Sequence, residues 1–147
     1  MKRGAFCLGV SVCVLVLMTA TAFAQLPGIP IRVNIPFDFL VRGKTLPAGE
    51  YEISRLSDEP QVLEISNIRN RHDHAAIETD PVQGTVPNHG KVVFHRYGDS
   101  YFLHEIWTTG LETGRELPAS HQEKMLRRET LAKGESVEPQ TVVLAIY

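Results

Sequence analysis

Two histidines and a glutamate near the middle of the chain have the residue types that acid/base chemistry requires. His95 precedes and His104 follows the dipeptide Gly98-Asp99, and Glu105 comes directly after His104. An imidazole accepts a proton near pH 7, and a neighbouring carboxylate can orient it. If Gly98-Asp99 forms a two-residue hairpin turn, the two histidines are diagonal neighbours on one face, whereas a three-residue turn separates them. His95, His104 and Glu105 are therefore the catalytic candidates. The competing and favoured interpretation is a core hairpin whose histidines are hydrogen bonded.

A second pair, His72 and His74, has a spacing that suits a metal ion. Residues i and i+2 of an extended segment point to the same side, so both imidazoles could bind one ion. A third ligand would have to come from another part of the chain, and the neighbours Arg69, Asn70 and Arg71 are typical of a solvated turn. A polar turn is the favoured interpretation, and the sequence predicts no cofactor.

The sequence lacks the residues that several classes of reaction require. Both cysteines, Cys7 and Cys13, lie in the apolar N-terminal segment, so the rest of the chain has no thiol for catalysis, disulfide exchange or metal binding. The glycine patterns of nucleophile elbows, phosphate-binding loops and dinucleotide sites are absent. No pattern places two carboxylates at the separation that a glycosidase needs. The sequence therefore contains no diagnostic catalytic motif.

The N-terminal segment has the features of a secretory leader. Lys2 and Arg3 precede an apolar run, and Ala22-Phe23-Ala24 then places small residues where a signal peptidase reads them. We predict cleavage between Ala24 and Gln25. The expected location of the product is the periplasm or the outside of the cell.

Cleavage would leave one domain of modest acidity. The full chain of 147 residues has 15 basic and 17 acidic side chains. Residues 1–24, the signal peptide, contain two of the basic residues, so residues 25–147 carry 13 against 17 and a net charge of −4 with histidine neutral. This balance excludes a generally basic nucleic-acid binder. Because no later apolar run is long enough for a spanning helix, we expect no integral membrane protein after processing.

Alternation of apolar and polar residues predicts most of the strands. The run from Ile31 to Val41 has apolar residues at every odd position, and its Pro36 indicates a sheet edge or a bend. Lys91 to Tyr97 and Ser100 to Thr108 form the strongest hairpin signal, with apolar residues on both faces. Further strand-forming runs lie at residues 51–55, 63–67, 75–79 and 141–147.

One helix is predicted near the C-terminus. Ser120 and Glu123 fit a capping box, in which each residue binds a backbone N–H of the other. Met125, Leu126 and Leu131 would form a narrow apolar stripe, while Glu123 is assigned to the face toward water.

These elements predict a mainly β fold, an antiparallel β-sandwich or small barrel with one helix near the C-terminus, in a single β-rich domain over residues 25–147. Pro81 to Gly90 and Gly110 to Pro118 are predicted to be long loops. Because long loops on a rigid sheet commonly carry recognition, we expect them to form the contact surface.

Two resemblances agree with this fold class. The segment Leu46-Pro47-Ala48-Gly49-Glu50-Tyr51-Glu52-Ile53 resembles the turn-to-strand segment of prealbumin-like, carboxypeptidase-regulatory-like sandwich modules, which implies a β-sandwich. A wider set of segments resembles a group of small exported bacterial proteins without assigned function: residues 36–39, 46–51, 94–99, 101–107 and 117–120. That resemblance implies no catalytic residue.

The sequence thus predicts an exported soluble β-sandwich module with a non-catalytic binding or structural role, whose partner is an unknown envelope or extracellular component. The alternative is a metal-dependent or acid/base hydrolase centred on His95, His104 and Glu105.

Overall fold

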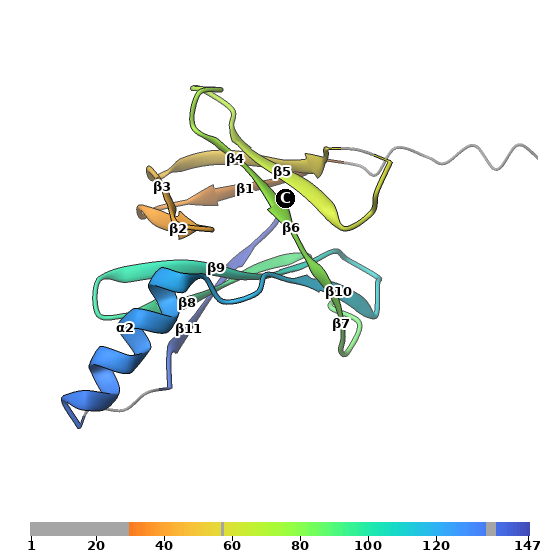
Figure 1. Cartoon of the computed structure of the whole chain (residues 1–147). Coiled ribbons are helices and arrows are strands. Elements are labelled where there is room, and N and C mark those ends of the chain that lie inside the picture. The colour runs from red at the N-terminus through yellow and green to blue at the C-terminus, as the bar shows by residue number, and fades with distance from the viewer. Residues whose placement is uncertain (1–29, 57, 135–137) are drawn as a thin grey trace, which may run out of the picture.

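The computed structural model describes residues 30–56, 58–134 and 138–147. The predicted cleavage site between Ala24 and Gln25 lies outside these residues. Within them, two β-sheets face each other, and one helix, α2 (His121–Ala132), stands at a corner (Figure 1). The prediction of a mainly β protein with one helix near the C-terminus is confirmed, and the sheets form a sandwich.

The first sheet has four antiparallel strands in the order β1 (Ile31–Ile35), β4 (Gly49–Arg55), β5 (Val62–Asn67) and β6 (His74–Glu78). Ile53 of β4 lies opposite Ile31 on one side and Ile65 on the other. Because alternate residues of a strand point to one face, this register places a row of aliphatic side chains toward the second sheet.

The second sheet has seven strands. Its main order is β11 (Gln140–Ala145), β8 (Lys91–Tyr97), β9 (Ser100–Trp107), β10 (Thr113–Glu116) and β7 (Asp80–Gln83). The short hairpin of β2 (Phe39–Val41) and β3 (Lys44–Leu46) joins it through β9. The contact of Leu40 with Phe102 in this junction is parallel, which departs from the antiparallel plan expected from the sequence.

The single strand predicted from Ile31 to Val41 divides at Pro36, and its two halves enter different sheets. Pro36 has no N–H to donate to a ladder, and β1 before it is an edge strand, as expected for proline. Val33 and Phe39, on either side of the crossing, are both fully buried. The alternation therefore identified the core side correctly although the chain changes sheets.

A second crossing occurs at Thr79, between β6 and β7. Thr79 is 1% exposed, and both its backbone N–H and its hydroxyl donate to the carbonyl oxygen of Gln61, at 2.9 and 3.0 Å. These two bonds satisfy the polar groups of a buried corner.

Two strands lie in segments that were predicted to be loops. β7 occupies the start of Pro81 to Gly90, β10 occupies the middle of Gly110 to Pro118, and the two strands pair with each other. The loop assignment is thus wrong for these residues. Neither strand alternates cleanly, since β10 has the sequence Thr-Gly-Arg-Glu and β7 begins with Asp-Pro.

The β8–β9 hairpin is the centre of the core, as expected. Gly98 has a φ of +59° in a two-residue turn, so Tyr97 lies opposite Ser100. Phe94 packs edge-on against Phe39 at 5.5 Å between ring centroids, on the side that faces the first sheet.

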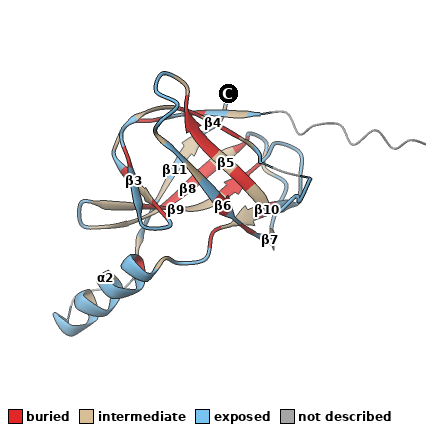
Figure 2. Ribbon diagram, turned by 45° about the horizontal axis from the view of Figure 1, so that its top comes forward, coloured by how far each residue is buried: buried red, intermediate tan, exposed pale blue. Residues whose placement is uncertain are grey.

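Helix α2 begins where the capping signal places it, but its buried residue is Glu123 and not a member of the predicted apolar stripe. The backbone N–H of Glu123 donates to Ser120 Oγ at 3.1 Å. Glu123, assigned to water, is 6% exposed, whereas Met125 and Leu131 are 49% and 56% exposed. Figure 2 shows α2 exposed along most of its length, so its first turn makes most of the contact with the sheet. No helix within the described ranges has the length and apolar character needed to cross a membrane.

Candidate functional site

The structure brings the two central histidines together. With the two-residue turn, His95 lies opposite Phe102, and a bulge between Val93 and Phe94 places His104 next to His95. Their rings stack with centroids 3.6 Å apart and planes 27° apart. The register that unites the histidines is therefore the one that the protein adopts.

Three carboxylates surround this pair. Glu105 Oε1 lies 3.5 Å from His104 Nε2, and Glu116 Oε1 lies 3.9 Å from the same nitrogen. Glu123 Oε1 of α2 lies 3.3 Å from His95 Nδ1. We call the five side chains His95, His104, Glu105, Glu116 and Glu123 the histidine cluster. All three catalytic candidates belong to it, and the sequence missed Glu116 and Glu123.

Burial changes the acid/base properties of the cluster. Removal from water lowers the pKa of His104, and the adjoining His95 lowers it further, while Glu105, Glu116 and Glu123 oppose the change. Burial likewise raises the pKa of Tyr97, with Glu123 as the next cause. His104 is thus neutral at pH 7, a form in which it can accept a hydrogen bond or a proton.

The groups of the cluster are also bonded to the rest of the protein. Glu105 accepts a hydrogen bond from Trp107 Nε1 at 2.7 Å through its second carboxylate oxygen. Glu123 accepts from the Tyr97 hydroxyl at 3.4 Å. Trp107 in turn packs against Gly114, where a Cβ atom would lie 2.7 Å from the indole ring. These contacts tie α2 and β10 to the central hairpin.

His72 and His74 stay apart from the cluster. Both are exposed at the turn between β5 and β6, and His74 Nδ1 lies 3.0 Å from the carbonyl oxygen of Arg71. The described residues contain no group of three or more His, Cys, Asp or Glu side chains arranged to hold a metal ion. No third ligand accompanies this pair within the ranges that the structure covers.

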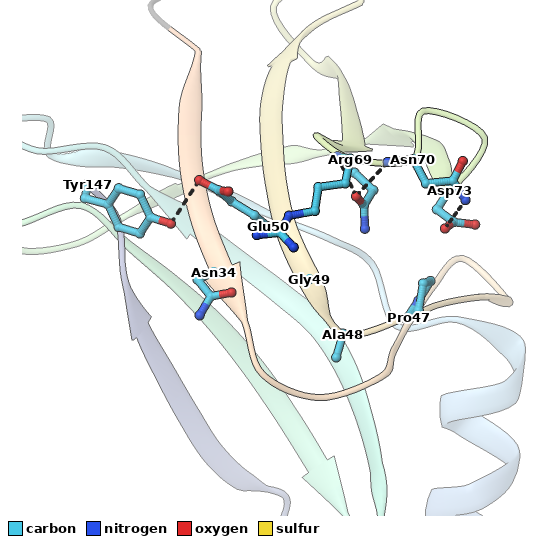
Figure 3. A pocket seen from close by; sticks show the side chains of 10 residues that line it. Asn34, Pro47, Ala48, Gly49, Glu50, Arg69, Asn70, Asp73 and Tyr147 are labelled. Atoms are coloured by element: carbon cyan, nitrogen blue, oxygen red, sulfur yellow. Dashed lines mark hydrogen bonds between the residues drawn. The ribbon is translucent and has the colours of Figure 1, made fainter.

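A polar hollow of about 620 Å³ lies beside the turn before β4 (Figure 3). Tyr147 donates its hydroxyl to Glu50 Oε1 at 3.3 Å, and Asn70 Nδ2 donates to Asp73 Oδ2 at 2.8 Å. Figure 3 shows these side chains around the rim of the hollow, with the backbone of Gly49 and Ala48 between them. Many of its polar groups are therefore already bound to one another.

A cleft of about 360 Å³ opens between the two sheets, where the β4–β5 and β9–β10 connections meet. Ile53 and Leu63 line it from the first sheet, and Ile106 lines it from the second. These three residues belong to the core, at 2%, 8% and 2% exposed. Leu111, which is 54% exposed, extends the apolar lining outward. We call this space the inter-sheet cleft.

The polar lining of the inter-sheet cleft contains cations and hydroxyls. Its members are Ser54, Arg55, Thr108, Thr113 and Arg115, and the lining formed by the described residues contains no Asp or Glu. Arg115 lies opposite Ile106 in the β9–β10 register, so its side chain leaves β10 on the same face as that core residue. Arg115 is half-buried and Arg55 is exposed.

The fold and the cleft define a β-sandwich domain with a ligand-sized cavity at one end and two arginines lining it. No family model, no curated protein and no solved structure matches the chain. The site is therefore interpreted from its own geometry.

The sequence identified parts of the cleft without identifying the cleft. Ile53 and Leu63 follow from the alternation of β4 and β5, and Thr113 and Arg115 lie in the segment Gly110 to Pro118 that was expected to form a contact surface. No local pattern in the sequence distinguishes Arg55 or Arg115 from the other arginines. Which strands meet at this end depends on the crossings at Pro36 and Thr79, which local patterns do not specify.

Proposed function

We propose that the protein is an exported, non-catalytic binding module of the cell envelope or the extracellular space, and that the inter-sheet cleft is its binding site for a small apolar molecule. The leader-like segment supports export. Sequencing the N-terminus of protein recovered from a bacterial periplasm tests this part, with Gln25 as the expected first residue. A product that keeps residues 1–24 would contradict export by cleavage.

The observation that carries the binding role is that the cleft reaches the core. Small-molecule sites are concave, largely apolar and about 300 to 1,000 Å³ in volume, with a few polar groups that orient the ligand. The inter-sheet cleft has this composition and a volume of about 360 Å³. An apolar ligand there would contact the core residues Ile53, Leu63 and Ile106 and would cover Leu111, which is 54% exposed. The removal of this apolar surface from water favours binding.

The histidine cluster is the basis of the alternative, an acid/base hydrolase centred on His95, His104 and Glu105. The stacked rings and the lowered pKa of His104 favour that chemistry. However, Glu105 already binds the indole of Trp107, and His95 faces the 6% exposed Glu123 that anchors α2. The same groups are thus engaged in holding strands and helix together, which supports a structural role.

Blocking the cleft tests the proposal. Thr113, at the exposed start of β10, lines the cleft, and Thr113→Phe would place a ring in its opening. We expect 1-decanol to shift the NMR signals of Ile53, Leu63 and Ile106 in the unmodified protein, and Thr113→Phe to weaken this binding at least tenfold. Thr141→Phe is the matched control, because Thr141 is an exposed strand residue outside the cleft. Absence of shifts, or equal weakening by both variants, would reject the cleft as the site.

A further inference from the structure

The charges of the inter-sheet cleft indicate what kind of apolar molecule it takes. We propose that its ligand is a single-chain amphiphile with an anionic head, of the fatty-acid type, whose head binds Arg55 and Arg115 and whose tail lies between the sheets. This inference rests on the proposed binding function and specifies its ligand class.

The first step is that both arginines lack a carboxylate partner within the part of the chain that the structure describes. The arginines that form ion pairs there are Arg32, Arg42 and Arg96, at 3.4 to 3.9 Å from Glu52, Glu78 and Asp99 respectively. Among the residues that the structure describes, no carboxylate oxygen is recorded in an ion pair with Arg55 or Arg115.

The second step is that these two positive charges lie in one cavity of a chain that has more acidic than basic residues, 17 against 15. None of the described residues that line the cleft is acidic, so no lining carboxylate among them offsets these charges. A cavity lined by one sign of charge, with low-dielectric walls, concentrates its field and attracts a ligand of the opposite sign. The cleft is therefore complementary to an anion and repels a cationic amphiphile.

The third step concerns how the head would be held. A guanidinium group presents donors in a planar fork that matches the two oxygens of a carboxylate or a phosphate. The hydroxyls of Thr108 and Thr113 line the same cavity and add donors that need no charge. Arg115 leaves its strand beside Ile106, so a head bound to it is next to the apolar wall that would receive the tail.

The fourth step is size. A cavity of about 360 Å³ has room for about twelve groups of the volume of a water molecule. Decanoate, with ten carbons and two oxygens, fits this number. A membrane lipid with two long chains is too large, so the cleft suits one short or medium chain.

The test compares three probes of equal chain length, each below its micelle concentration: decanoate, 1-decanol and decyltrimethylammonium. Isothermal titration calorimetry on residues 25–147 should give the tightest binding for decanoate, at least tenfold above the alcohol, and the weakest for the cation. Decanoate binding should weaken with added salt, because screening reduces charge attraction. Among shorter carboxylates, affinity should rise about fourfold per methylene until the cavity is full.

Substitution of the arginines identifies the head group's partners. Arg55→Gln and Arg115→Gln should each weaken decanoate about tenfold, as expected for loss of a hydrogen bond to a charged group, and should leave 1-decanol unchanged. Arg32→Gln, at a paired arginine outside the cleft, is the matched control and should change neither. Decyl phosphate in the same series distinguishes a phosphate head from a carboxylate head.

The outcomes separate this inference from the function on which it rests. Equal binding of decanoate and 1-decanol, insensitive to both arginine variants, overturns the anionic class and leaves an apolar binding site. Preference for the cation overturns it as well. Failure of every probe to bind the unmodified protein rejects the binding function itself. Circular dichroism of each variant establishes that a lost signal does not come from lost folding.

Discussion

The histidine cluster and the inter-sheet cleft both contain ionisable side chains, but these side chains have different surroundings in the two regions. In the cluster, every charged group contacts another charged or polar group of the chain, and α2 covers His95 with Glu123. In the cleft, two arginines adjoin an apolar cavity and pair with no carboxylate of the described residues.

This difference distinguishes charged side chains that stabilise the fold from charged side chains that are available to a ligand. The histidines are catalytic candidates in the sequence because imidazole is the commonest acid/base group near neutral pH. Their partners in the structure are neighbouring strands and the helix. Arg55 and Arg115 carry no recognisable motif, yet they line a cavity and form no ion pair with a carboxylate of the described residues. Removing a charge should therefore have opposite effects on stability in the two regions.

The largest expected effect is in the cluster. Glu123→Ala removes the acceptor that contacts both His95 and Tyr97, so the free energy of unfolding should fall by about 2 kcal/mol. Urea denaturation measures the change, and hydrogen exchange should show that α2 loses protection. Glu129→Ala, at an exposed position of the same helix, is the control and should change stability by less than about 0.5 kcal/mol. A loss of stability shared by both variants would contradict the anchoring role of Glu123.

An intermediate effect is expected on the pH dependence of stability. The pKa of folded His104 lies below its ordinary value of 6.5, so the unfolded chain binds more protons in the window between the two values. The stabilisation is therefore present above about pH 6.5 and is lost as pH falls through the folded pKa.

Urea denaturation at a series of pH values compares the wild type with His104→Asn, which should show a shallower decline below pH 6.5. His121→Asn, at an exposed histidine, should keep the wild-type slope. Identical slopes for the wild type and His104→Asn would show that His104 does not titrate differently on folding.

The smallest expected effect has the opposite sign and lies in the cleft. Arg115→Met keeps the length of the side chain and removes a half-buried charge without a partner, so the ligand-free protein should gain up to about 1 kcal/mol of unfolding free energy. Thermal unfolding in buffer measures the gain, and decanoate should no longer raise the melting temperature by the wild-type amount. A marked loss of stability would show that Arg115 contributes to the fold and is not reserved for a ligand.

Much of the fold could be predicted because the alternation of apolar and polar residues along a strand indicates which face of the strand is buried. Val33 and Phe39 occupy apolar positions of the alternating run from Ile31 to Val41, and both are fully buried. The Gly98-Asp99 turn determined the hairpin register and hence the possible meeting of His95 with His104. Local patterns succeed here because a strand's two faces and a tight turn are properties of neighbouring residues.

Local patterns could not predict all residues of the histidine cluster and the inter-sheet cleft, because both sites depend on contacts between distant segments. Glu123 is buried through His95 and Tyr97, which are far from it in the sequence and outweigh its place on a polar helix face. β7 and β10 stabilise each other as neighbours at one side of the sheet, although neither shows a strand pattern alone. Residues of both sheets line the cleft. The position of Arg115 in the cleft therefore depends on its neighbour Ile106 and on the two places where the chain crosses between the sheets.

The bond between the backbone N–H of Tyr147 and the carbonyl oxygen of Arg32, at 3.2 Å, has a consequence for how the protein is made. It joins the residues that follow β11 to β1, and β11 itself is the outer neighbour of β8. A chain that emerges from the ribosome N-terminus first must hold β8 without this neighbour until residues 140–147 follow. Folding that depends on such distant pairings is slow, and unpaired strand edges are prone to aggregate. Completion of the sandwich is therefore a late step in the folding of the chain.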